Sequence, residues 1–228
     1  MIKPIRVTEV FKAAARGKFC LLILGFTALV PVAPAQADWL DSIPRFASAQ
    51  AEGGWHKGPR GYHSMCARDP KLCMYDYQAR QDQGVSAPKR LDQPQWNELD
   101  RLNREMNRAI RPRTDPGPDH WTLGVYSGDC EDYAIAKKHA LIEADWSADQ
   151  LLYAVVEGIS SPYHLVLVVR TDRGDFVLDN LTDRITSWED SGYTFVIRQS
   201  AEDPTQWAYV PGSGQRTGTL GTAGVGTQ

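Results

Sequence analysis

The sequence has little of what marks a nucleic-acid-binding, membrane-embedded or repeat protein. Its 228 residues carry a net charge of only −3 at pH 7, which gives no sign of a nucleic acid or an acidic polymer as a partner. No internal repeat is visible, and beyond the N-terminal region no segment is apolar and long enough to cross a membrane. The length fits one domain of ordinary size with room for a hydrophobic core.

The N-terminus has the layout of a secretory signal peptide. Basic residues precede the apolar run FCLLILGFTALVPVA, and the small-x-small sequence Ala35-Gln36-Ala37 follows it. This pattern predicts that residues 1–37 are a signal peptide cleaved after Ala37, and that the mature chain is exported. Because the apolar run is short for a membrane-spanning helix, an uncleaved anchor is the less favoured alternative.

Cysteine is scarce, and of the four in the chain Cys20 leaves with the signal peptide. Export favours disulfides, and Cys66 and Cys73 stand close together across a proline-containing turn. We predict that they pair, which would contribute about 2–3 kcal/mol on the chain-entropy model. Half of a zinc site with His63 is an alternative, but it needs further cysteine or histidine ligands nearby. Pairing leaves Cys130 as a thiol that is either buried and inert or kept for chemistry.

The mature chain divides into three parts by composition. Residues 38–92 are rich in glycine, proline and polar residues, which predicts loops and short elements held by the disulfide. Residues 93–210 carry the periodic apolar patterns of a folded core. Residues 211–228 have too few large apolar side chains to pack, and we expect disorder there.

The core pattern predicts helices followed by an antiparallel sheet, which is an α+β fold. A first helix begins at Pro94 and ends before Pro112, and a second runs from Cys130 to about Ala144. Strands are expected over residues 151–158, 164–171, 175–180, 193–198 and 207–210.

The stretch SGDCEDYAI places Cys130 among three carboxylates. Negative neighbours disfavour a thiolate, but Asp129 suits an N-cap and would put Cys130 in the first turn of its helix, where the dipole favours one. Glu131 and Asp132 also suit that first turn. Ordinary capping beside a packed, inert cysteine therefore stays open as an alternative.

Two later residues complete a possible catalytic set. His164 starts one strand and Asp179 ends the next, and the start of an antiparallel strand lies near the end of its successor. A tight turn around Arg173-Gly174 would offset the pair, so we expect a longer loop or a bulge if they meet. Cys130, His164 and Asp179 would then form a Cys–His–Asp triad. Taken singly, the histidine could cap a strand end and the aspartate could be a turn residue.

The segments GDCEDYAIAKKHALIEA and HLVLVVRTDRGDFVLDNLTDRI resemble the bacterial transglutaminase-like cysteine peptidases. This family includes LapG-type periplasmic proteases, which release biofilm adhesins from the cell surface. The resemblance implies a papain-like or transglutaminase-like core with Cys130 as nucleophile, His164 as base and Asp179 as orienting residue. It also implies a periplasmic location, a protein substrate such as a surface adhesin, and an inner-membrane regulatory protein.

The resemblance also suggests a role for the acids around the cysteine. LapG-type members bind calcium through acids beside the catalytic cysteine, which correspond here to Asp129 and Glu131, with Asp132 as a further candidate. Carboxylate oxygens suit calcium, and a divalent ion would offset the charges that raise the thiol pKa. The candidates for stabilising an oxyanion are the backbone N–H of Cys130 and the indole of Trp121, although a lone tryptophan is more often a core residue.

Three functions follow from these residues. The leading hypothesis is an exported thiol hydrolase that cuts a protein through a thioester acyl-enzyme. A transglutaminase or amide transferase would form the same thioester and pass it to an amine. A calcium-dependent binding module without catalysis would instead have an unreactive Cys130, and its binding would survive Cys130→Ala.

Overall fold

The structure is a computed structural model that describes residues 50–81, 86–115, 120–157 and 163–211. The expected signal peptide and residues 212–228 of the expected disordered tail lie outside these ranges. None of the helices within them is long and apolar enough to cross a bilayer.

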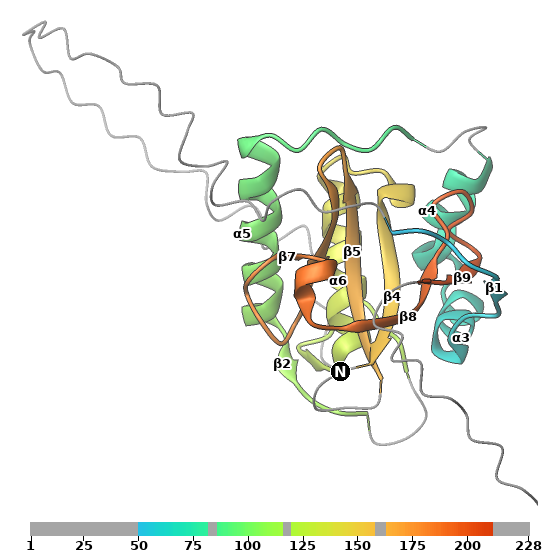
Figure 1. The fold of residues 1–228 in the computed structure, drawn as a ribbon. Helices are drawn as coiled ribbons and strands as arrows, with labels where there is room; N and C mark the ends of the chain where they lie inside the picture. Colours follow the sequence, from blue (N-terminus) through green and yellow to red (C-terminus); the bar gives the residue numbers. More distant parts are fainter. Residues whose placement is uncertain (1–49, 82–85, 116–119, 158–162, 212–228) are drawn as a thin grey trace, which may run out of the picture.

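The α+β fold expected from the sequence is confirmed. A sheet of seven antiparallel strands has the order β1-β9-β8-β4-β5-β6-β7 (Figure 1). The helices of the described part are α3 (Arg60–Arg68), α4 (Pro70–Gln81), α5 (Gln93–Ala109) and α6 (Cys130–Glu143), with short 3-10 turns η1 (Ala148–Gln150) and η2 (Glu189–Ser191). The strands are β1 (Trp55–His56), β4 (Leu151–Glu157), β5 (His164–Thr171), β6 (Gly174–Leu178), β7 (Thr186–Ser187), β8 (Thr194–Gln199) and β9 (Trp207–Tyr209), and β2 (Arg111–Pro112) pairs separately with β3 (Ser127–Gly128).

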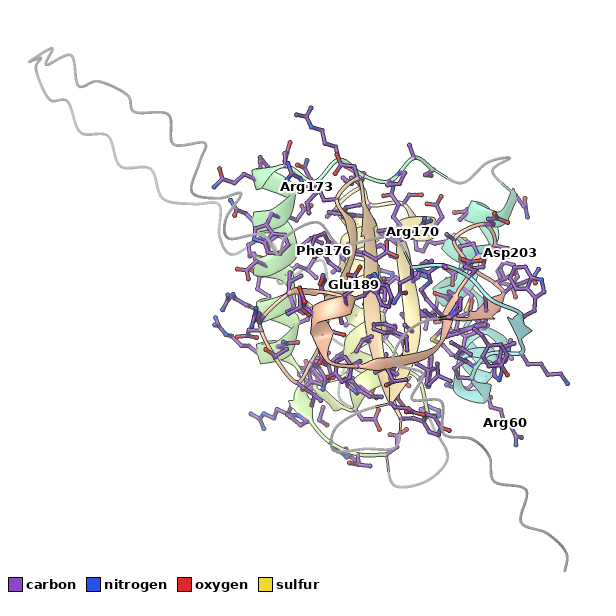
Figure 2. All side chains as sticks on the ribbon, viewed as in Figure 1. Arg60, Arg170, Arg173, Phe176, Glu189 and Asp203 are labelled. Atoms are coloured by element: carbon purple, nitrogen blue, oxygen red, sulfur yellow. A yellow bond between two sulfur atoms is a disulfide. The ribbon has the colours of Figure 1, made fainter. Side chains whose placement is uncertain are left out.

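Different segments pack on the two faces of the sheet. In Figure 1, α6 lies behind the sheet and the connection that carries η2 passes in front of it. Side chains alternate between these faces along each strand. Leu165 and Leu167 belong to the large core cluster on the helix side, whereas Val166 and Val168 belong to a smaller cluster on the outer side. Phe176, labelled in Figure 2, packs on the helix side edge-on to Trp96 of α5, with ring centroids 5.6 Å apart.

The segment expected to be loop-rich instead holds a helical hairpin, α3 and α4, joined by the Cys66–Cys73 disulfide. The Asp69 carboxylate accepts a hydrogen bond from the Lys71 N–H (3.1 Å), and Pro70 is the first residue of α4. Aspartate followed by proline marks a helix start as well as a turn. The prediction of loops failed because it took this proline as a turn signal only.

A buried ion pair attaches this hairpin to α6. Lys138 Nζ lies 2.6 Å from Asp76 Oδ1 of α4 and 3.1 Å from Gln199 Oε1 of β8. The Asp76 carboxylate also accepts a hydrogen bond from the Tyr62 hydroxyl of α3 (2.9 Å). The helix that starts at Cys130 is therefore held to α3, α4 and β8 by one polar cluster.

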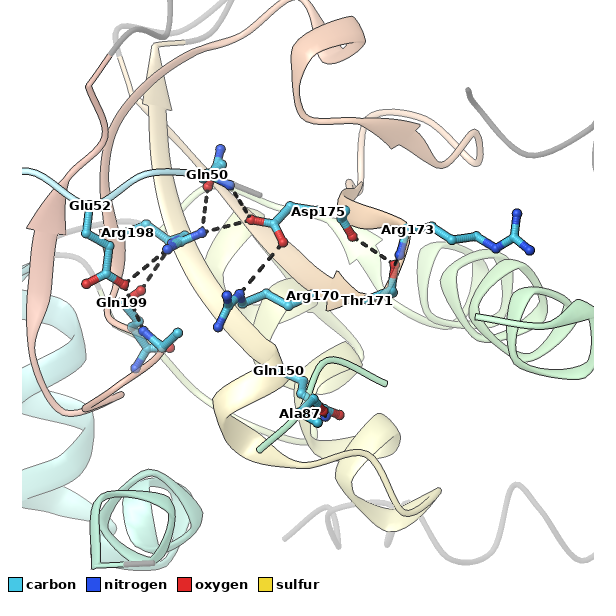
Figure 3. A network of polar contacts seen from close by, with 12 residues as sticks. Gln50, Glu52, Ala87, Gln150, Arg170, Thr171, Arg173, Asp175, Arg198 and Gln199 are labelled. Atoms are coloured by element: carbon cyan, nitrogen blue, oxygen red, sulfur yellow. Dashed lines mark hydrogen bonds and ion pairs between the residues drawn. The ribbon is translucent and has the colours of Figure 1, made fainter. Parts of the chain in front are cut away.

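A second buried network secures the N-terminal segment across the outer face of the sheet (Figure 3). Arg198 of β8 pairs with Asp175 of β6 and with Glu52, each at 3.1 Å. Asp175 also accepts a hydrogen bond from the Gln50 backbone N–H (2.8 Å). Strands β6 and β8 and the segment of Gln50 and Glu52, which are far apart in the sequence, are thereby fixed relative to one another.

Candidate active site

The α6 N-terminus places Cys130 at the end of the sheet. Asp129 occupies the N-cap position with an extended backbone, but its side chain makes no capping hydrogen bond. Instead its Oδ2 accepts a hydrogen bond from the Asp115 backbone N–H (3.2 Å). A Cβ at Gly128 would clash with Asp132 Oδ2 and lie 2.7 Å from the Asp132 Cβ, so only glycine fits before the cap.

Cys130 lies at a cavity of about 360 Å³. The cavity is also lined by His164 and Leu165 of β5, Val155 of β4 and Trp121. This wall is mostly apolar.

The surroundings of the Cys130 thiol oppose its ionisation in the protein alone. The thiol pKa is raised mainly by burial and next by the charge of Glu131, whose Oε2 lies 3.3 Å from Sγ. The charge of Asp129 adds to this rise. A hydrogen bond from the Leu165 backbone acts in the opposite direction. A reactive thiolate here therefore needs positive charge close by, from an imidazolium or a cation.

His164 and Asp179 meet directly: His164 Nε2 donates to Asp179 Oδ1 at 2.8 Å, and both side chains are buried. The expectation of a long loop or bulge between the two strands was wrong. The turn is tight, with Thr171 opposite Gly174 and Leu167 opposite Leu178.

The pair meets because the contact is diagonal. The printed pairs end with Leu167 opposite Leu178, and one further step along the same register puts Asp179 opposite Val166, the next residue after His164 on the same face. Diagonal neighbours on one face are within reach of long side chains. The tight turn therefore brings His164 and Asp179 together by placing them diagonally across the two strands, not directly opposite each other.

The turn after β6 holds Asp179 in place. Its Oδ1 also accepts the Leu181 backbone N–H (3.0 Å), and Asn107 of α5 donates to its carbonyl (3.0 Å). Burial alone would raise the pKa of this carboxyl, but hydrogen bonds from His164, Tyr193 and Leu181 and the charge of His164 hold it below its usual value. Asp179 is therefore ionised at neutral pH, with its carboxylate hydrogen-bonded to His164.

The three residues approach the end of the sheet from two sides. His164 and Asp179 alternate with Leu165 and Leu178, which face the helices, so their side chains start from the outer face. Cys130 comes from the helix face. Because Nε2 is engaged by Asp179, Nδ1 is the imidazole nitrogen left for the thiol, and both residues line the same cavity.

Trp121 lines the cavity and is buried. Its ring packs edge-on to Tyr153 and Tyr62, with centroids 5.8 and 6.1 Å apart, and its carbonyl accepts a hydrogen bond from Arg68 Nη2 (2.9 Å). The residue is thus part of the aromatic core and of the cavity wall at once. The N–H of Cys130, in the first turn of α6, is the other oxyanion candidate.

The acids next to the cysteine separate into two groups. Asp129 and Glu131 gather with Asp115, each offering a carboxylate oxygen within 4.8 Å of the others. Asp132 turns away, accepting the Thr122 backbone N–H at 2.9 Å, and burial, against that hydrogen bond, raises its pKa to about 7.

This trio of carboxylates fits a hard cation. The Oδ1 atom of Asp129 is buried and has no hydrogen-bond partner within the described residues. Carboxylate oxygens are among the ligands that calcium prefers. The residues present therefore fit calcium, with Asp115 in the place that the sequence suggested for Asp132.

Three residues of this site were not found from the sequence: Asp115, Asn107 and Tyr193. Asp115 lies in the proline-rich loop before Trp121, and nothing local links it to Asp129. Asn107 is one of many polar residues of α5, and no local pattern distinguishes it from the others. Tyr193, whose hydroxyl donates to Asp179 Oδ2, follows a glycine after η2, and that glycine signals a turn but not its target.

Comparisons with known proteins found one matching family and several similar solved structures. A family described as "Bacterial transglutaminase-like cysteine proteinase BTLCP" matches residues 52–215, more than half of the chain. Among solved structures, calcium-bound LapG of Legionella pneumophila is similar with 21% identity and a TM-score of 0.45, covering 66% of this chain and 93% of that one. Another L. pneumophila LapG structure has 23% identity and a TM-score of 0.44, covering 60% and 85%. No curated protein sequence matches.

Proposed function

The chain belongs to the bacterial transglutaminase-like cysteine proteinase family, and from that premise we propose that it hydrolyses a protein substrate through a Cys130–His164–Asp179 triad. The observation that carries this proposal is the 2.8 Å hydrogen bond between His164 and Asp179 beside a cavity that Cys130 also lines. The family match shows that the chain is a cysteine peptidase. The triad, the substrate, the bond that is cleaved and the activating ion are proposed.

The residues act in two half-reactions. His164 takes the thiol proton, and Cys130 Sγ attacks a backbone carbonyl to form a tetrahedral intermediate. The protonated imidazole gives its proton to the leaving amine, which departs and leaves a thioester. Water then attacks the thioester, His164 accepts the water proton, and the thiolate leaves as the acid product is released. Asp179 keeps the imidazole oriented and stabilises its charged form.

Calcium is part of the proposal, with Asp115, Asp129 and Glu131 as the residues that would hold it. When bound, the ion supplies positive charge that offsets the carboxylates disfavouring the thiolate. The orphaned Asp129 oxygen supports this assignment. Backbone carbonyls complete such a shell in calcium sites.

The N-terminal sequence and the family support the following location and partners for the reaction. The chain acts in the periplasm after cleavage of its signal peptide behind Ala37. Its substrate is a protein of the cell surface, such as an adhesin, and an inner-membrane protein controls its access. The mass of the mature protein from a periplasmic fraction checks the first point, since it should begin at Asp38.

The activity is tested with unfolded casein and a fluorescent primary amine, in calcium and in a chelator. We expect new casein fragments in calcium but not in the chelator, no fragments from Cys130→Ala, and no fluorescent label on the casein. Fluorescent casein without fragments would make the protein an amide transferase instead. If the folded enzyme gives neither fragments nor labelled protein with any of a panel of unfolded proteins, it is not a catalyst, and the binding module takes its place.

A further inference from the structure

Asp179 receives a third hydrogen bond that the triad does not account for. The Tyr193 hydroxyl donates to Asp179 Oδ2 at 2.5 Å, while Oδ1 is occupied by His164 Nε2 and the Leu181 N–H. The two oxygens of the carboxylate are thus engaged separately, one by the imidazole and one by the tyrosine. A carboxylate held at both oxygens cannot rotate about its Cβ–Cγ bond without losing a charge-assisted hydrogen bond.

Tyr193 also contacts the imidazole itself. The rings of His164 and Tyr193 have centroids 5.7 Å apart and planes inclined by 46°. Tyr193 packs against the outer-face cluster of the sheet, the side from which His164 and Asp179 also project. One side chain therefore restrains both the imidazole and its carboxylate, from the face opposite to α6.

The connection between β7 and β8 is built to aim this residue. Gly192 has a φ of 76°, a conformation that other residues rarely adopt, although a Cβ there would meet nothing within 4 Å. The backbone turn, not space, thus requires the glycine. The Tyr193 N–H donates to Ser191 Oγ (3.3 Å), and burial together with Asp179 raises the tyrosine pKa, so its hydroxyl keeps the proton it donates.

We infer that Tyr193 is a positioning residue of the active site: it locks the Asp179 carboxylate so that His164 keeps its proton on Nε2 and presents Nδ1 to Cys130. This inference rests on the proposed triad. It adds that triad geometry depends on the β7–β8 connection, which lies far from Cys130 in the sequence. A hydrogen bond to a charged group contributes about 1.5–3 kcal/mol, so its loss should slow the chemical step roughly 10- to 100-fold.

The test is Tyr193→Phe, which keeps the ring contact and removes the hydrogen bond. Tyr77→Phe, an exposed tyrosine on α4, is the matched control. In protein with ¹⁵N-labelled histidine, NMR at a pH where His164 is neutral should show the Nε2–H tautomer in wild type and Tyr77→Phe. Tyr193→Phe should show a mixture of tautomers, and in calcium its rate of Cys130 alkylation by iodoacetamide at pH 6 should fall about tenfold or more.

The outcomes separate this inference from the triad. Suppose that His164→Ala loses Cys130 reactivity while Tyr193→Phe keeps both the wild-type tautomer and the wild-type rate: then Tyr193 does not position the site, and the triad stands. If His164→Ala reacts like wild type, the triad itself fails. A Tyr193→Phe protein that is slow but retains the wild-type tautomer would also overturn the inference, because its defect would be a general loosening of the loop.

Discussion

Two adjacent lysines on α6 show how much a single buried residue depends on its partner. Lys137 is 1% exposed and its Nζ has no hydrogen-bond partner within the described residues, whereas Lys138 is 3% exposed and pairs with Asp76 at 2.6 Å. Burial lowers the pKa of Lys137 to about 7, although the charges of Asp179 and Asp183 act against the shift. The same substitution at the two positions should therefore have opposite effects.

Lys137→Met should raise the free energy of unfolding at pH 7. Between pH 7 and 10.5 the unfolded lysine binds a proton that the folded one does not, so wild-type stability rises with pH across this window. At about 1.4 kcal/mol per pKa unit, the advantage of the variant should be roughly 3–5 kcal/mol at pH 7 and should vanish near pH 10.5. Denaturant unfolding at several pH values measures this difference, and a pH-independent difference would mean that the proton of Lys137 is not its cause.

Lys138→Met should instead destabilise the protein by about 3–5 kcal/mol at pH 7, because it leaves the buried Asp76 carboxylate without its cation. The same denaturant experiment measures this loss. A variant as stable as wild type would mean that the ion pair does not hold α4 to α6.

At the scale of elements, two asparagines of α5 hold the turn that contains Asp179 by hydrogen bonds. Asn103 and Asn107 lie one helical turn apart, and their amides donate to carbonyls of the 179–183 turn, with Asn107 also reaching Asp183 Oδ1 at 3.1 Å. The helix thus sets the position of the residue that directly follows β6.

Asn107→Ala should lower the kcat of casein cleavage about tenfold and leave KM nearly unchanged, because the turn loosens while the cavity is intact. Asn97→Ala, at an exposed position of the same helix, is the control and should behave like wild type. A rise in KM at constant kcat would show that Asn107 serves substrate binding instead.

At the scale of the whole molecule, a calcium site at Asp115, Asp129 and Glu131 would join the loop before Trp121 to the start of α6. Binding to the folded state alone stabilises by about 2.7 kcal/mol at a hundredfold excess over Kd. We expect calcium to raise the Tm by about 5–10 °C.

When Tm is followed against calcium concentration, Asp115→Asn should raise the calcium concentration at the midpoint at least 10- to 100-fold. Loss of an outer-sphere contact alone typically lowers metal affinity by that factor. Glu202→Gln, an exposed acid elsewhere, should leave it unchanged. Equal midpoints for Asp115→Asn and wild type would remove Asp115 from the site.

The sequence predicted what local patterns encode. Helix α5, helix α6 and the strands with strong periodicity agree with the structure within a few residues, and Cys130 lies at the helix start where its acidic neighbours suggested. Asp115 and Tyr193 could not be predicted, because their roles arise from contacts between distant segments. The diagonal contact of His164 with Asp179 also lay beyond the sequence, since strand order alone does not fix which side chains reach across.

The most direct test of the central claim is the rate at which iodoacetamide alkylates Cys130 at pH 6 in calcium, compared between wild type and His164→Ala. The wild-type rate should lie well above that of a free thiol, whose pKa is about 8.5, because His164 holds the thiolate as an ion pair. The rate should collapse in His164→Ala. Equal, slow rates in the two proteins would mean that Cys130 is an inert thiol and that the triad is not catalytic.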